Sequence, residues 1–195
     1  MVDIVSKKSY ADVSLRMSEI LRYSRCDENI GEELKSLLDE CIELCKKEIK
    51  PEVCWKEVNI TSECDFYLDT YKVDSDNLKG MLEGYDKAVV FAATVGLGLD
   101  KLTRRYSLTA PEKAVFMHAV GAEAVEALCD KFCGELAERY DEITPRFSPG
   151  YGDLALDFQK SVDEMLSMSR NVGITLLDNL MMVPTKSVTA IVGVK

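Results

Sequence analysis

The chain has 195 residues, of which 47% are apolar, and this is enough to fill the core of one domain. Its formal net charge of −10 at pH 7 argues against binding to nucleic acid or an anionic membrane, because both require clustered Lys and Arg. The N-terminus shows no charged start, apolar run and small-residue cleavage site of a secretory signal, so we expect a cytoplasmic protein.

Apolar residues at helical spacing predict two N-terminal helices. The first is expected over residues 10–23 and the second from about residue 30 to residue 45, just before Pro51. Together they would form an N-terminal helical part, residues 1–50, of a single domain that spans residues 1–195.

Residues 51–195 are expected to contain the sheet. The segments 53–58 and 64–68 are short and rich in β-branched or aromatic residues, which is typical of strands. A short helix should follow near 77–83. The run 88–93 is apolar without interruption, which predicts a central strand that is covered on both faces.

The second half of the chain alternates long and short elements. A helix is expected after Gly98, and a long one over 111–139 with Pro111 in its first turn. A loop over 144–154 and a helix near 156–169 should follow. The segments 181–183 and 188–192 resemble a closing hairpin. Helices with a mostly antiparallel sheet predict an α+β fold.

Two motifs match only part of the pattern of a known cofactor-binding site. Segment 96–98 is Gly-Leu-Gly after a strand, but Lys101 stands where a dinucleotide fingerprint needs its third glycine. His118 opens an H-x-x-G pattern like that of cobalamin-binding proteins, but Phe116 replaces the aspartate of D-x-H-x-x-G. We therefore expect a tight turn at 96–98 and no cobalamin bound to this chain itself.

The seven cysteines are expected to be mostly reduced and packed in the core. Cys41 with Cys45, and Cys129 with Cys133, are spaced by four residues and could place two thiolates on one helical face for zinc or an iron–sulfur cluster. Because Cys41 and Cys45 fall on an apolar stripe, packing is favoured. A metal or redox protein remains as one alternative.

The loop after the long helix holds the most informative residues. Arg146, Pro149, Gly150, Tyr151 and Gly152 bring a guanidinium, close backbone approach and an aromatic ring together. These groups suit a ligand that carries a carboxylate and a cationic centre. The alternative is an ordinary solvent-exposed loop, in which the arginine pairs with a nearby acid.

This loop resembles the R-x-x-x-G-Y signature of the S-adenosylmethionine-binding activation domain of cobalamin-dependent methionine synthase. Gly173-Ile174-Thr175-Leu176 and the following M-x-P-x-x-S-V pattern over 182–188 resemble the closing stretch of that family. The similarity runs from about residue 88 to the end. It implies the activation-domain fold and a bound S-adenosylmethionine.

The resemblance also implies roles for particular residues. Arg146 would bind the methionyl carboxylate, Glu126 would pair with the ammonium or sulfonium charge, and Tyr151 would shape the face from which the methyl group leaves. Pro149, Gly150 and Gly152 would complete the cofactor-binding set, with Tyr151 as its catalytic member. After Gly150-Tyr151 the family continues Pro-x-Cys-Pro, whereas this chain continues Gly-Asp-Leu-Ala.

The function implied is that of a stand-alone reactivation partner. S-adenosylmethionine would serve in the reductive remethylation of cob(II)alamin, which is held only by a partner: a cobalamin-dependent methionine synthase or another corrinoid protein. A flavodoxin-like reductant would supply the electron. The alternative is a docking module for a corrinoid protein that keeps the fold but has lost productive S-adenosylmethionine binding.

Overall fold

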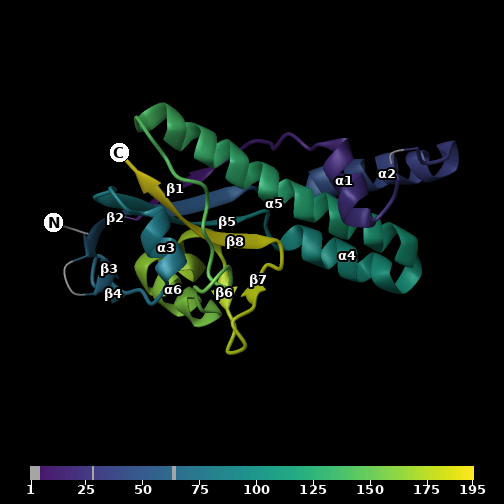
Figure 1. Cartoon of the computed structure of the whole chain (residues 1–195). Helices are drawn as coiled ribbons and strands as arrows, with labels where there is room; N and C mark the ends of the chain where they lie inside the picture. The colour runs from purple at the N-terminus through teal and green to yellow at the C-terminus, as the bar shows by residue number, and fades with distance from the viewer. Residues whose placement is uncertain (1–4, 28, 63–64) are drawn as a thin grey trace.

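A central antiparallel sheet organises the molecule (Figure 1). Strand β5 (Lys87–Thr94) pairs with β2 (Glu52–Ser62) along one edge and with β8 (Ser187–Val194) along the other, so the predicted central strand is confirmed. Helices cover both faces, and the predicted α+β class with a mostly antiparallel sheet is confirmed as well. The computed structural model describes residues 5–27, 29–62 and 65–195.

Two short strands share the other edge of β2. β1 (Ser6–Ser9) pairs with its first half, and β3 (Phe66–Leu68) pairs with its last residues, followed by β4 (Tyr71–Lys72). The residues of β1 are polar and mostly exposed, so the sequence has no apolar alternation that would predict this strand. The N-terminal part is therefore not purely helical. The first residue of the predicted strand 64–68 lies outside the described residues.

Alternate residues of β5 enter two cores on opposite faces of the sheet. Phe91 lies in the core beneath α5 (Pro111–Arg139), where its ring centroid is 5.0 Å from that of Phe132. Val90 faces the other way, into the core beneath α6 (Gln159–Leu166). Both cores exclude water from the middle of β5, which explains why its sequence is apolar from Ala88 to Ala93.

The core that contains Phe91 is covered by α5 and by three other helices in the described part of the chain. α5 has the bounds that the sequence predicts for the long helix, and no helix in the described part of the chain has the length and apolarity needed to cross a membrane. Cys41 and Cys45 are fully buried here, as their place on the apolar stripe predicts. The helices that join α5 on this side are α1 (Met17–Ser24), α2 (Glu32–Glu48) and α4 (Leu97–Thr109).

The first helix is shorter than its apolar spacing predicts. Residues 11–16 are not helical, and α1 begins only at Met17. Tyr10 is buried in the core, and its hydroxyl donates to Glu135 Oε2 of α5 at 3.0 Å. This contact and the pairing of β1 hold the chain extended before α1, so tertiary contacts override the local helical pattern.

The second core lies under short elements. These are α3 (Asp76–Met81), the 3-10 helix η1 (Leu156–Phe158), α6 and α7 (Met168–Val172). The predicted single helix over 156–169 is interrupted at Ser167, which adopts a left-handed conformation with φ 46°. Asp163 Oδ1 accepts a hydrogen bond from the Met168 backbone N–H at 3.1 Å, and this contact caps the restart as α7.

The predicted closing hairpin is wrong in its pairing. β7 (Met182–Val183) pairs with β6 (Thr175–Leu176), and β8 joins β5 in the main sheet instead. The reason is burial: β8 is buried from Thr189 to Val194 and therefore needs a central strand as its neighbour. The small β6–β7 hairpin is left to project beside the sheet (Figure 1).

The glycine turn at 96–98 allows the end of α2 to pack closely against the start of α4. A Cβ atom on Gly98 would lie 2.7 Å from the backbone oxygen of Glu48 at the end of α2. Atoms do not approach so closely without displacement, so only glycine lets the two helix ends meet. On the exposed side of α5, by contrast, a Cβ on Gly134 would meet nothing within 4 Å.

Gly98→Ala should therefore lower the free energy of unfolding by ~1–3 kcal/mol, the range for overpacking a tight contact. The matched change Gly134→Ala should raise it by up to ~1 kcal/mol, because alanine favours a helix interior over glycine. Urea unfolding of both variants measures the difference. Equal effects of the two substitutions would contradict the close packing of Gly98.

Candidate functional site

Arg146 lies in the segment 141–147, which runs along the outer edge of β8. The Phe147 N–H donates to the Ile191 carbonyl at 2.9 Å, and the Ile191 N–H donates back to the Phe147 carbonyl at 2.8 Å. Neighbouring residues of an extended segment point to opposite sides. Phe147 therefore enters the core under α6, while Arg146 reaches toward α5.

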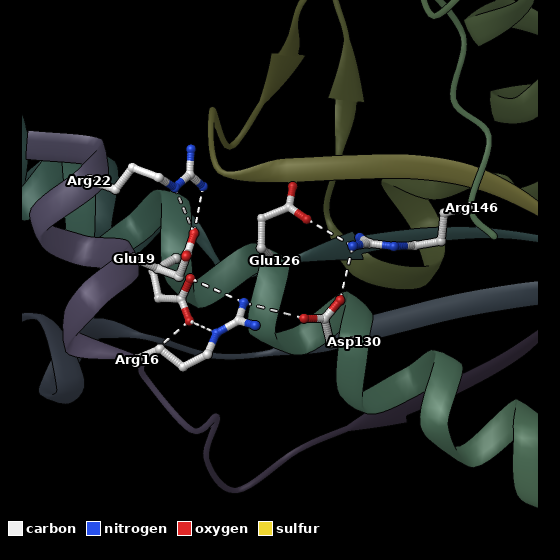
Figure 2. A network of polar contacts seen from close by, with 7 residues as sticks. Arg16, Glu19, Arg22, Glu126, Asp130 and Arg146 are labelled. Atoms are coloured by element: carbon white, nitrogen blue, oxygen red, sulfur yellow. Dashed lines mark hydrogen bonds and ion pairs between the residues drawn. The ribbon is translucent and has the colours of Figure 1, made fainter. Parts of the chain in front are cut away.

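The Arg146 guanidinium meets two carboxylates of α5 (Figure 2). Its Nη2 donates to Glu126 Oε2 at 3.0 Å and to Asp130 Oδ1 at 3.0 Å. The side chains of Arg146, Glu126 and Asp130 are 26%, 35% and 48% exposed. Partial burial makes this attraction stronger than that of a fully solvated surface pair. The site is thus organised around one shared positive charge.

Two cysteine thiols of α5 lie close to the same guanidinium. Burial raises the pKa of Cys129 to about 12 and that of Cys133 to about 11, although the positive charge of Arg146 opposes both shifts. Both thiols are therefore protonated and uncharged at neutral pH. Within the described part of the chain, no group of three or more His, Cys, Asp or Glu side chains is placed to hold a metal ion.

A hollow of about 390 Å³ opens beside the ion pair. Its volume falls within the ~300–1,000 Å³ typical of small-molecule sites. The walls come from α5, the turn after Arg146, the start of α6, the β6–β7 hairpin and the beginning of β8. Side chains that line it include Glu126, Pro149, Gln159, Met181, Thr185 and Ser187.

Three hydroxyl groups that line this hollow already donate hydrogen bonds to other side chains. Thr185 Oγ1 donates to Asp100 at 2.6 Å, Ser187 Oγ donates to Thr94 Oγ1 at 2.9 Å, and Thr189 Oγ1 donates to Gln159. A hydroxyl oxygen that donates its proton still has lone pairs to accept with. This wall therefore offers acceptors to a ligand.

The turn that follows Arg146 shapes the rim of the hollow. Pro149 lines the hollow directly. Gly150 has φ 87°, a left-handed conformation that favours glycine, and a Cβ there would lie 3.2 Å from Leu156 Cδ1. Tyr151 is 68% exposed, and its ring stands edge-on to Phe147 with centroids 5.4 Å apart.

The end of the turn faces away from the hollow. A Cβ on Gly152 would lie 2.9 Å from Asn77 Nδ2 of α3. Asp153 caps the same helix, accepting from the Ser75 hydroxyl at 2.5 Å and from the Asp76 N–H at 2.9 Å. The Ser75 hydrogen bond is the main cause that holds the pKa of Asp153 below its usual range. Gly152 thus anchors the turn to α3.

The structure therefore pairs Arg146 with Glu126 and places Glu126 and Pro149 in the lining of the hollow. Gly150 lies beside Leu156, Tyr151 points to solvent and Gly152 packs on α3. Sequence reasoning missed Asp130, although its position one turn after Glu126 on the same helix was a usable signal. It also missed the opposite wall from the β6–β7 hairpin and β8, because no local motif marks residues that meet only through the fold.

His118 lies outside the hollow. It is exposed on α5, with the Lys186 Nζ 3.2 Å from its Nδ1. Burial, and then the ammonium of Lys186, lower the pKa of His118. The histidine is therefore mostly neutral at pH 7, and it occupies a helix, as the sequence predicts.

A larger hollow of about 660 Å³ lies elsewhere, between residues 11–17 and α2. It contains none of the predicted site residues. Its rim carries Asp12 and Glu43, which pair with Lys131 and Lys46 respectively. The hollow beside Glu126 is the better candidate because two predicted site residues, Glu126 and Pro149, line it together with several hydrogen-bond acceptors.

The candidate site holds one group that can pair with an anion and one that can pair with a cation. Arg146 can pair with a carboxylate, Glu126 can pair with an ammonium group, and the two already lie within one hydrogen bond of each other. A free α-amino acid group carries these two charges at a similar spacing.

The sequence matches no protein-family model, and no curated protein matches it either. Among solved structures, the chain is similar to the crystal structure of the MetH reactivation domain bound to AdoHcy. The TM-score is 0.69 with 14% sequence identity, and the match covers 97% of this chain and 78% of that one. At this level of identity the likeness concerns the fold. The chain therefore shares its fold with the MetH reactivation domain.

Proposed function

We propose that the chain binds S-adenosylmethionine in the hollow beside Glu126 and acts as a stand-alone reactivation partner of a cobalamin-dependent methionine synthase. Two findings support this proposal. The fold is that of a domain crystallised with AdoHcy, the product left when S-adenosylmethionine gives up its methyl group. The predicted ligand residues Glu126 and Arg146 form an ion pair, and Glu126 lines a hollow of suitable size.

The observation that carries the proposal is the Glu126–Arg146 ion pair. The amino-acid end of S-adenosylmethionine has a carboxylate and an ammonium group, so it can insert between these two side chains. Arg146 then pairs with the ligand carboxylate and Glu126 with its ammonium, so that each side chain exchanges one charged partner for another. This exchange leaves neither side chain with an unpaired charge, so the free-energy cost of opening the ion pair is low.

The rest of the ligand finds fitting chemistry deeper in the hollow. The adenine amino group and the ribose hydroxyls are donors, and the oxygens of Thr185, Ser187 and Thr189 are acceptors. Tyr151, at the rim, can place its ring face near the sulfonium, since aromatic faces attract cations. Its present exposure leaves room for it to turn toward the ligand.

In this proposal a partner protein supplies the cobalamin that accepts the methyl group. S-adenosylmethionine carries a methyl group activated by its sulfonium, and cobalamin on a methionine synthase or another corrinoid protein would receive it after one-electron reduction by a flavodoxin-like donor. This chain's own work is to hold the methyl donor, orient it and exclude water from it. Proximity then makes a bimolecular reaction effectively unimolecular.

Arg146→Ala should raise the dissociation constant for S-adenosylmethionine by roughly 10- to 150-fold, which corresponds to the ~1.5–3 kcal/mol of a hydrogen bond between charged groups. Titration calorimetry measures it. The thermal midpoint should change little, because the lost ion pairs are partly exposed. Arg105→Ala, the same change at an exposed position of α4, serves as the matched control and should leave binding intact.

Two outcomes would contradict this assignment. An unchanged dissociation constant in Arg146→Ala would place the ligand elsewhere. A wild-type protein that shows no saturable binding at all would favour the docking module that keeps the fold without productive S-adenosylmethionine binding.

Transfer of a labelled methyl group should depend on the partner. Under reducing conditions, we expect rapid transfer from S-adenosylmethionine to cobalamin held on its cognate carrier, and slow transfer to free cobalamin, because only the carrier fixes the acceptor in line with the donor. At S-adenosylmethionine concentrations near the wild-type dissociation constant, Arg146→Ala should greatly reduce the difference, because little donor is then bound. Equal rates with free and carrier-bound cobalamin would overturn the partner model.

A further inference from the structure

The carboxylate of Asp130 links two arginines that come from distant parts of the chain (Figure 2). Its Oδ1 accepts from Arg146 Nη2 at 3.0 Å, and its Oδ2 lies 3.3 Å from Arg16 Nη2. Arg146 belongs to the loop after α5, and Arg16 belongs to the segment that leads into α1. One carboxylate therefore joins the candidate site to the N-terminal part of the protein.

Arg16 is itself fixed at a buried point. Glu123 of α5 is 0% exposed and accepts from Arg16 Nε at 2.8 Å, from its Nη2 at 3.4 Å and from its backbone N–H at 3.2 Å. A buried carboxylate needs such partners, because an unpaired charge in the core is costly. Arg16 thus has a firm anchor, although its own side chain is 52% exposed.

The polar chain runs along one stripe of α5. Glu123, Glu126 and Asp130 are spaced by three and four residues, so their side chains project from one face of the helix. The order of contacts is Glu123, Arg16, Asp130, Arg146 and Glu126, with opposite charges alternating along it. Glu123 at one end of this series is buried, and Glu126 at the other end lines the hollow.

We infer that Asp130 is a positioning residue that keeps the Arg146 guanidinium against Glu126, which lines the hollow, and that Arg16 holds Asp130 in place. The inference rests on the proposed function in one respect. If Glu126 turns to a ligand ammonium, Arg146 loses that partner, and Asp130 remains as the carboxylate that restrains it. Asp130 then determines how much conformational freedom Arg146 must lose when it binds a carboxylate.

Side-chain NMR of arginine tests the positioning role without any ligand. Asp130→Asn keeps the shape of the side chain but removes its charge, so the order parameter of the Arg146 guanidinium should fall. Asp39→Asn, the same change at an exposed position of α2, is the matched control and should leave that order parameter unchanged. An Arg146 side chain that is equally ordered in wild type and Asp130→Asn would overturn the inference.

Arg16→Lys separates positioning from stability. A lysine at this position still places a positive charge opposite buried Glu123, so the thermal midpoint should stay near that of the wild type. Its single ammonium cannot reproduce the planar fork that reaches Glu123 and Asp130 together, so Arg146 order should fall as in Asp130→Asn. A lysine variant with wild-type Arg146 order would show that Arg16 has no part in the positioning.

Ligand titration then distinguishes this inference from the proposed function. Asp130→Asn should raise the S-adenosylmethionine dissociation constant by about 3- to 10-fold, a smaller effect than that of Arg146→Ala, because a half-exposed pair is partly screened. If Arg146→Ala weakens binding and Asp130→Asn does not, the positioning role is wrong while the proposed function stands. If neither change affects binding, the proposed function itself fails.

Discussion

Backbone pairing between the segment 141–147 and the outer edge of β8 determines where the charges of this protein meet. Because Phe147 is hydrogen-bonded in both directions to Ile191, its side chain must enter the core under α6. Arg146, one residue earlier, must then point to the opposite side, toward α5. A shift of one residue in this pairing would bury the guanidinium and expose the aromatic ring. The candidate site therefore depends on a strand register as much as on its side chains.

That register gives the site its electrostatic character. Three carboxylates on one stripe of α5 face two guanidiniums, and one of these carboxylates, Glu123, is fully buried. The contacts therefore leave a formal excess of one negative charge. S-adenosylmethionine carries a net charge of about +1 at neutral pH, from one carboxylate and two cationic groups, so it would neutralise this excess.

Sequence reasoning succeeded where burial dictates composition. The continuous apolar run of β5 and the Ala-rich length of α5 reflect elements that are covered on several sides, and their positions were predictable for that reason. It failed where long-range contacts decide the outcome. The edge strand β1 has no apolar pattern, residues 11–16 are held out of the helix by contacts with α5, and β8 finds its partner only in the folded sheet.

The residues of the candidate site also fall into those that the sequence predicts and those that it does not. Arg146, Pro149 and Gly150 lie within one short loop, so a local motif could single them out. The side chains of Asp130 and Arg16 are half-exposed, and nothing in the sequence shows that they form an ion pair. Sequence distance hides this contact, since Arg16 and Asp130 lie 114 positions apart in the chain.

A crystal structure of the protein with S-adenosylmethionine tests the central claim most directly. We expect the ligand carboxylate within hydrogen-bond distance of the Arg146 guanidinium, the ligand ammonium on Glu126, and the Arg146–Asp130 contact preserved. A ligand bound in another hollow, or one bound here with the Glu126–Arg146 pair still closed, would contradict it.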